Sequence, residues 1–383
     1  MAAPTEPKIS FMKRYPLLGP LFGFIFVLLL FQAMVYSRNG TTFLTPDTLG
    51  LILIQTVIVA TGALGMTVII VAGGIDLSAG SVVAFSGVTA AVLLRDGHSS
   101  MVALLGALAV GALVGLVNGF IIARFDLMPF IVTLGMMSTA RGLAQKVGDN
   151  QTVNYSFGTT EGINGLMNNP TTIYDAAVEH FKNIDVNGVA QKVLSHDHDV
   201  PHWLFNLCSH FMRADPDQHG ALFVPLWLPN YGVLIMLALT IIMSVVLNRS
   251  VYGRHIFALG SNEDTARLCG LRTFWLKVSV YVLGGLFMGL AGVFNLARLR
   301  QGDVTAGTGM ELDIITAVVI GGASLNGGVG SIWGAVIGAL TMTALHSGCV
   351  QMGWMSYNQL IIIGIVLVLA VGLDKFRSRG LKG

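Results

Sequence analysis

The stretch RSVYGRHIFALGSNEDTARLCGL, residues Arg249–Leu271, lies between two long apolar runs and carries the start and stop signals of a short helix. Ser261 and Asp264 fit the S/T-x-x-D/E capping pattern, in which a side-chain oxygen accepts an N–H group at the helix start. Glu263 and Asp264 place negative charge in the first turn, where the helix dipole favours it. Gly270 can turn left-handed and end the helix. The stretch therefore predicts a short, stiff polar element that can dock onto a soluble partner.

The composition around this stretch is that of a polytopic membrane protein. Of the 383 residues, 54% are hydrophobic and only 11% are charged, and the mean hydropathy is +0.72. Soluble domains carry about 25% charged residues. The lipid bilayer is thus the expected environment. The net charge of +2 gives no indication of a nucleic-acid partner, and we expect none.

Apolar runs of about 20 residues, the length that crosses a bilayer as a helix, recur along the chain. They predict an all-α protein with about ten transmembrane helices, in which the third, fifth and eighth have the weakest signal and some helices are short or broken. The first run lacks a cleavage site and is read as a retained span. The ten ranges are 17–36, 50–72, 77–94, 101–123, 127–145, 229–247, 276–296, 310–321, 327–348 and 358–373.

Basic residues set the expected orientation. Lys and Arg are frequent at both termini and in the loop 249–275, and rare in the short loops on the other side. The positive-inside rule therefore places both termini and this loop in the cytoplasm. The expected organisation is a tail at 1–16, a first membrane half at 17–145, an outside insertion at 146–226, a second half at 227–375 that includes the cytoplasmic loop, and a tail at 376–383.

The insertion 146–226 is polar and rich in histidine. His196, His198, His202, Cys208 and His210 lie close together in sequence, and imidazole and thiolate groups are zinc ligands. Their spacing is irregular and matches no zinc motif. We therefore interpret this segment as a solvated loop and predict no metal site.

Two segments with paired glycines suggest a weak internal repeat. Residues 73–80 read GGIDLSAG and residues 321–328 read GGASLNGG, and a helix of small apolar residues follows each. Many transporters are built from repeats with interrupted helices. In the ten-span topology both breaks precede helices that run outward, so the expected repeat is parallel.

Asp76 is the clearest functional candidate inside the membrane, because a carboxylate there is costly. It either caps the helix that follows or binds a substrate or ion directly, and capping is the simpler role. Glu311 and Asp313 have the same two possible roles at another helix start.

Other residues in the spans could contact a transported molecule. Asn118, Thr133 and Asn295 could bond a polar group of that molecule or a neighbouring helix. Phe130 and Phe294 could stack on a ring of that molecule or pack as ordinary core residues. The spacing of Gly115 and Gly119 permits close approach of another helix.

The chain lacks the G-x-x-x-x-G-K-[ST] motif with which a P-loop binds ATP; no Gly-Lys pair occurs in the sequence. We expect no ATPase site, no other enzymatic site and no cofactor. If ATP drives this protein, another chain must hydrolyse it.

Five ordered motifs resemble the permease subunits of ribose-, xylose- and galactose-type ABC importers. They are GGIDLSAGS (73–81), GLVNG (115–119), PFIVTLG (129–135), GRHIFALGSNEDTARLCGL (253–271) and ELDIITAVVIGGASLNGGVGS (311–331). The resemblance implies a pair of permeases in the bacterial inner membrane, with an ABC ATPase subunit and a periplasmic sugar-binding protein as partners.

The resemblance also implies site residues. The loop that contacts the ATPase maps onto Gly253, Arg254, Gly260, Asn262, Glu263, Ala266, Arg267 and Gly270. The insertion 146–226 is longer than the family's loop and leaves open how the binding protein docks. The alternative function is an ion-coupled secondary transporter that uses Asp76 or Glu311.

Overall fold

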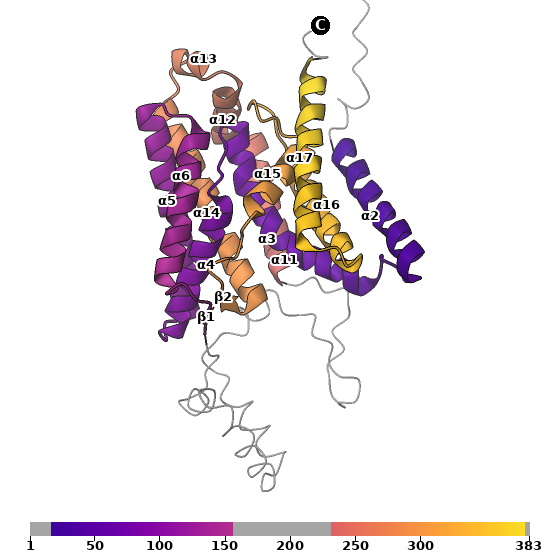
Figure 1. The fold of residues 1–383 in the computed structure, drawn as a ribbon. Coiled ribbons are helices and arrows are strands. Elements are labelled where there is room, and N and C mark those ends of the chain that lie inside the picture. The colour runs from indigo at the N-terminus through magenta and orange to yellow at the C-terminus, as the bar shows by residue number, and fades with distance from the viewer. Residues whose placement is uncertain (1–16, 156–230, 380–383) are drawn as a thin grey trace, which may run out of the picture.

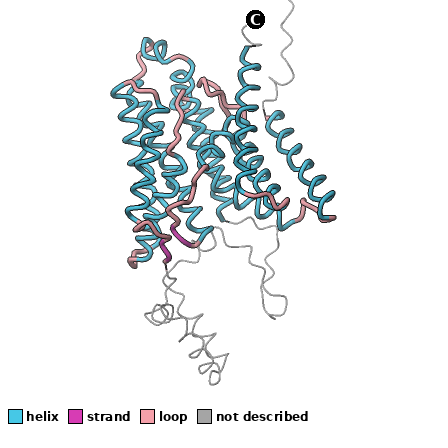
Figure 2. The backbone as a smooth tube through the Cα atoms, viewed as in Figure 1, coloured by secondary structure: helices cyan, strands magenta, loops and turns pink. Residues whose placement is uncertain are grey.

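The computed structural model describes residues 17–155 and 231–379, and within these ranges the chain is almost entirely helical (Figures 1 and 2). Each of the ten apolar ranges contains a helix, as predicted. The helices are α2 (Leu18–Asn39), α3 (Pro46–Val71), α4 (Ala79–Arg95), α5 (Ser100–Phe125), α6 (Pro129–Val147), α11 (Tyr231–Arg249), α12 (Val251–Ser261), α13 (Glu263–Leu268), α14 (Thr273–Leu299), α15 (Met310–Ile320), α16 (Ile332–Gln351) and α17 (Ser356–Arg379). Two short strands, β1 (Val153–Asn154) and β2 (Gln301–Gly302), pair antiparallel. Residues 1–16 and the histidine-rich stretch of the insertion lie outside the described residues.

The helices form one bundle with two distinct ends (Figure 1). Helices α12 and α13 and the C-terminal end of α17 lie at one end, which we call the α13 end. The β1–β2 pair lies at the opposite end, the β end. Among the described residues, six helices are long and apolar enough to cross a membrane. Helix α15 has only 11 residues, or about 16 Å, and cannot cross a core of about 30 Å by itself.

Helices α3 and α14 form the centre of the bundle, and glycines let their neighbours approach closely. A Cβ on Gly111 of α5 would collide with the carbonyl oxygen of Gly285 of α14, and one on Gly115 with that of Tyr281. Because lipid provides no hydrophobic drive between helices, such close backbone packing is a main source of their association. The predicted close approach at Gly115 and Gly119 is confirmed, and α14 is the helix that approaches.

The predicted glycine repeat reflects a common helix-ending turn. Gly73 donates its N–H to Ile70 O and Gly74 to Ile69 O, whereas at the other segment Gly322 donates to Val319 O and Ala323 to Val318 O. The equivalent turn residues are therefore Gly73 and Gly322, both at positive φ, which is one residue out of the sequence register. The same turn ends other helices, including α13 at Gly270. The pairing of 73–80 with 321–328 is thus wrong.

The structure contains a different internal repeat. Residues 76–81 read DLSAGS and residues 303–308 read DVTAGT; each follows a long helix and precedes a short one. The carboxylate Oδ1 of Asp76 accepts the backbone N–H and the hydroxyl of Ser78 at 2.8 and 2.5 Å. Asp303 Oδ1 accepts the same two groups of Thr305 at 2.8 and 2.7 Å.

This repeat is inverted, in contrast to the parallel repeat expected. Helix α4 follows α14 toward the β end, since Gly87 packs on Gly292 and Val88 on Gly302. Helix α15 instead follows α3 toward the α13 end. The two short helices therefore start next to each other inside the bundle and run in opposite directions. A Cβ on Gly80 would collide with the carbonyl oxygen of Gly307, so the two copies meet backbone to backbone.

Candidate functional site

Helices α12 and α13 form the element predicted to dock a soluble partner. Ser250 Oγ accepts the N–H of Gly253 at 3.0 Å and caps α12. Asn262 Oδ1 accepts the N–H of Thr265 at 2.8 Å and caps α13. The prediction that Ser261 caps α13 is therefore wrong, because α12 extends through Ser261. The prediction for Gly270 is confirmed: it has φ +84° and ends the helix turn.

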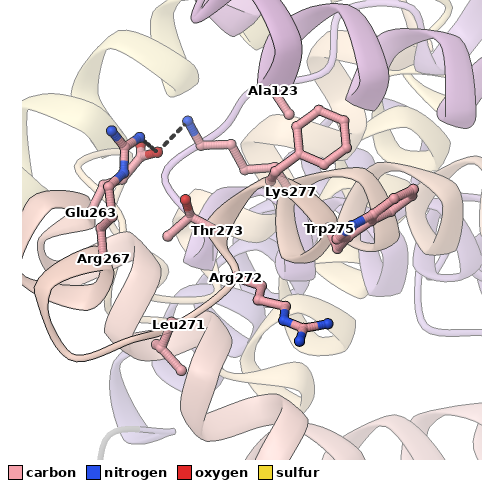
Figure 3. A pocket seen from close by; sticks show the side chains of 9 residues that line it. Ala123, Glu263, Arg267, Leu271, Arg272, Thr273, Trp275 and Lys277 are labelled. Atoms are coloured by element: carbon pink, nitrogen blue, oxygen red, sulfur yellow. Dashed lines mark hydrogen bonds and ion pairs between the residues drawn. The ribbon is translucent and has the colours of Figure 1, made fainter.

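A chain of ion pairs ties α13 to the membrane helices (Figure 3). Glu263 Oε1 lies 2.6 Å from Lys277 Nζ on α14 and 3.4 Å from Arg267 Nη2. Lys277 Nζ also lies 3.6 Å from Asp126 Oδ1 in the turn between α5 and α6. The Lys277 side chain is only 17% exposed, so this contact is less screened by solvent than a surface pair. The first turn of α13 is thereby held against α14.

The eight residues predicted to contact an ATPase fall into two groups. Gly253, Ala266 and Gly260 are packed against the bundle, and Glu263 is engaged by Lys277. The other four are exposed: Arg254, Asn262, Arg267 and Gly270. Only these four are free to touch a partner without rearrangement of the loop.

One exposed residue of α13 was missed by the sequence reasoning. Leu268 is 88% exposed, the largest value among the exposed large hydrophobic residues of the described chain. It follows the buried Ala266 by two residues, which places it about 200° away on the opposite face of the helix. The two-residue spacing between Ala266 and Leu268 could have predicted from the sequence that Leu268 lies on the face opposite Ala266. A groove of about 540 Å³ between α13 and α14 is lined by Arg267, Arg272 and Trp275 among others, and Leu268 is not part of its lining.

The loop 249–271 packs directly against the first interruption of the membrane helices, the non-helical segment 72–78 between α3 and α4. A Cβ on Gly260, near the end of α12, would collide with the carbonyl oxygen of Val71 at the end of α3. The same carbonyl accepts the N–H of Gly328 at 2.9 Å. Gly73 packs against both Gly260 and Gly327. The end of α12, the end of α3 and the loop before α16 therefore meet at one backbone junction.

In and around the segment that follows Gly73, three of the six predicted pathway residues come together. Asp76 is 2% exposed and bound to Ser78, and Asn118 Nδ2 donates to Ser78 Oγ at 3.2 Å. Thr133 Oγ1 accepts the N–H of Leu77 at 3.2 Å. These contacts hold the non-helical segment 72–78 in place. Asp76 is not the helix cap in the strict sense, because α4 begins after Ser78.

The other three predicted residues lie elsewhere. Phe130 is 52% exposed on the outside of α6. Phe294 is fully buried and Asn295 is 8% exposed, both near the β end of α14. The structure therefore brings Asp76, Asn118 and Thr133 into one cluster and leaves Phe130, Phe294 and Asn295 outside it.

The two acidic residues at the start of α15, Glu311 and Asp313, differ in their contacts. Asp313 Oδ2 lies 3.2 Å from His346 Nε2 of α16, and His346 Nδ1 lies 3.2 Å from Gln359 Oε1 of α17. Glu311 lies against Gly80, at the point where the two copies of the repeat meet. One oxygen of each carboxylate, Glu311 Oε2 and Asp313 Oδ1, is buried without a hydrogen-bond partner among the described residues.

The contacts of Asp76 predict a paired mutational result. Asp76→Ala leaves the N–H and hydroxyl of Ser78 buried without their acceptor, which costs about 1–3 kcal/mol per group. Asp76→Asn keeps the acceptor oxygen and removes the buried charge, so its stability should stay near that of the native chain. Thermal unfolding of the purified chain in detergent measures both. Equal destabilisation by Ala and Asn would show that the charge, and not the acceptor, matters at this position.

Taken together, the folded chain is a polytopic helical membrane protein with interrupted helices and a short exposed helix at one end, an architecture found in transport subunits. The chain belongs to the permease family described as "Branched-chain amino acid transport system / permease component", which it matches over residues 48–371.

Several curated relatives span most of the chain. It is 34% identical to the ribose import permease protein RbsC of Escherichia coli K12, over 91% of this chain and 92% of that protein. It is 30% identical to the L-arabinose ABC transporter permease protein AraH of Azospirillum brasilense, over 93% and 87%. It is 29% identical to the xylose transport system permease protein XylH of Haemophilus influenzae, over 91% and 96%. No solved structure matches the chain. The predicted family membership is confirmed.

Proposed function

We propose that this chain is the membrane-spanning subunit of an ATP-binding-cassette importer and forms the passage for a monosaccharide. The observation that carries this proposal is the family membership together with the docking helix α13, which presents Leu268 outward and is tied inward by Lys277. The sugar class follows from the relatives, which are named for ribose, arabinose and xylose. A separate ABC ATPase supplies the hydrolysis, and a periplasmic binding protein delivers the sugar.

The α13 end faces the cytoplasm in this proposal, and both termini lie on that side of the bacterial inner membrane. The basic residues of the loop 249–275 support this orientation through the positive-inside rule. The insertion 146–226 is then periplasmic, on the side where a binding protein arrives. A second copy of the chain completes the passage.

The contacts of the loop suggest how an ATPase would act on the passage. Movement of α13 is passed to α14 by the pair of Glu263 and Lys277, and movement of α12 reaches the break at Gly73 through the junction at Gly260. Exposed groups of α13 bind the ATPase, and the buried glycines and Ala266 transmit its motion. Coupling of this kind requires two discrete arrangements of the packed elements.

The energy source is the measurement that tests this function. The chain, its ATPase and its binding protein are reconstituted in proteoliposomes. Sugar uptake should require ATP inside the vesicles and should continue in the presence of an uncoupler that collapses ion gradients. Ribose, xylose and arabinose are the first sugars to compare. Uptake by the chain alone, driven by an ion gradient, would contradict this proposal. It would support the ion-coupled alternative with Asp76 or Glu311.

A further inference from the structure

The two copies of the inverted repeat differ sharply in exposure. In the first copy Asp76 is 2% exposed, and Ser78 and Ser81 are 0% and 1% exposed. In the second copy Thr305 and Thr308, the counterparts of Ser78 and Ser81, are exposed. The same local fold is therefore buried in one copy and exposed at the surface in the other.

The surface of the second copy lies deep in the membrane. Gly307 touches Gly80, which is 15 residues before the β end of α4 at Arg95. At 1.5 Å per residue that is about 22 Å from the end of the helix, in a hydrocarbon core of about 30 Å. The segment 303–309 consists of consecutive turns and not of a regular helix.

Polar groups surround this segment. Arg141 of α6 donates from Nη1 to the carbonyl oxygens of Val304 and Ala306, at 3.0 and 2.6 Å. Glu311 lies next to this segment in the first turn of α15, and its Oε2 lacks a hydrogen-bond partner among the described residues. An arginine, a carboxylate and two threonines thus lie together at a depth where lipid accepts none of them.

Non-helical backbone and charged groups occur at membrane depth only where protein buries them or water reaches them. The first copy satisfies the first condition and the second copy does not. The exposed face of residues 303–311 must therefore be covered by something polar.

We propose that this face, formed by Asp303, Thr305, Thr308 and Glu311 and held in shape by Arg141, lines the passage and binds the hydroxyl groups of the transported sugar. The inference rests on the proposed function and locates its binding surface. Carboxylate oxygens accept hydrogen bonds from sugar hydroxyls. The hydroxyls of Thr305 and Thr308 donate to Asp303 Oδ1 and to the carbonyl oxygen of Thr305, and their lone pairs can accept hydrogen bonds from the sugar. The start of α15 adds the partial positive charge of a helix N-terminus toward sugar oxygens. The Asp76 copy serves as the buried scaffold of this surface and not as a ligand.

Water access to Thr308 provides the test, and its buried counterpart Ser81 provides the control. Single Thr308→Cys, Ser81→Cys and Leu113→Cys variants are made in a chain whose native Cys208, Cys269 and Cys349 are replaced by serine. Leu113 lies mid-way along α5 and is 59% exposed in an apolar stripe, so it controls for exposure to lipid. Each variant is reconstituted with the ATPase and binding protein and treated with 2-sulfonatoethyl methanethiosulfonate, and the parent without these cysteines is treated in parallel.

A thiolate, which forms in water, attacks the reagent's sulfur and displaces methanesulfinate to form a mixed disulfide, so the Thr308→Cys variant should react about tenfold faster than the two controls. The sulfonate it attaches should then block the passage and reduce sugar uptake at least tenfold. Thr308→Val should reduce uptake, and Thr308→Ser, which keeps the hydroxyl, should retain it.

Slow labelling of Thr308→Cys, equal to that of Leu113→Cys or Ser81→Cys, would overturn the proposal and indicate that a second copy or another segment covers this face. Full labelling with unchanged uptake would overturn it as well. If the untreated parent complex shows no ATP-dependent uptake of ribose, xylose or arabinose, the proposed function itself is contradicted. If the parent transports and only the labelling result is negative, this inference alone fails.

Discussion

Replacing Leu268 by aspartate is expected to reduce ATP-driven uptake by more than tenfold while the chain remains folded in the membrane. Leu268 is 88% exposed at the tip of α13 and makes no contribution to the packing of the bundle. A buried apolar anchor at the centre of an interface contributes about 2 kcal/mol or more, which corresponds to roughly 30-fold weaker binding when it is lost. Co-purification with the ATPase and sugar uptake in proteoliposomes both measure the effect.

Two control variants separate docking from folding at this position. Leu268→Met keeps an apolar side chain of similar volume and should bind the ATPase normally. Arg95→Gln changes an exposed residue at the β end of α4, far from α13, and should leave ATPase binding normal. Normal uptake by Leu268→Asp would contradict the assignment of α13 as the docking element, whereas loss of monodisperse protein would mean that the residue is structural.

Gly80→Val is expected to have the largest effect on stability. A Cβ at this position would overlap the carbonyl oxygen of Gly307 and Glu311 Oε2, so the starts of α4 and α15 would have to separate. Overpacking costs about 1–3 kcal/mol where side chains can yield, and backbone atoms yield less than side chains. We expect most of the folded protein to be lost and an intermediate loss for Gly80→Ala. Gel filtration and thermal unfolding in detergent measure both.

Gly23→Val is the matched control for this substitution. Gly23 lies inside α2, and nothing lies within 4 Å of the position that its Cβ would occupy. The same change of residue type in a membrane helix should therefore leave folding intact. A native unfolding temperature for Gly80→Val would mean that the two half-helices are not in contact in the folded protein.

The helices were predictable because the bilayer imposes a simple requirement on sequence. A span must be long, apolar and helical, and all ten predicted ranges contain helices. The third and eighth ranges had a weak signal for a physical reason: α4 and α15 are short and start inside the bundle. Their starts are packed by protein, so hydropathy does not mark them.

Within the loop 249–271, the short helix α13 was predicted to within one residue of its cap, because caps and glycine turns are local. The error of one residue at Ser261 arose because α12 was not recognised as a helix that continues through it. Once α12 is included, Asn262 is the extended residue between two helices and its side chain is the one free to cap. A local capping pattern predicts the wrong cap residue where the preceding helix includes that residue.

The internal repeat was placed wrongly because two glycines are a weak marker. The hexapeptides DLSAGS and DVTAGT were both visible in the sequence, and their Asp-x-Ser/Thr hydrogen bonds are a recognisable local motif. Which copy is buried depends on contacts among α4, α6, α14 and α15, which no local pattern contains. For that reason Asp76 was named from the sequence as a pathway candidate, and Thr305 and Thr308 were not considered.

The ion pairs among Glu263, Lys277 and Asp126 have a mechanical consequence. A loop joined to its helices only by flexible peptide would deform when pushed and would dissipate the displacement. Here the first turn of α13 is held against α14 by Glu263 and Lys277, and Lys277 also lies 3.6 Å from Asp126 in the α5–α6 turn. In the proposed importer, we expect a displacement of α13 to be transmitted to the 27-residue helix α14, which extends to the β end of the bundle.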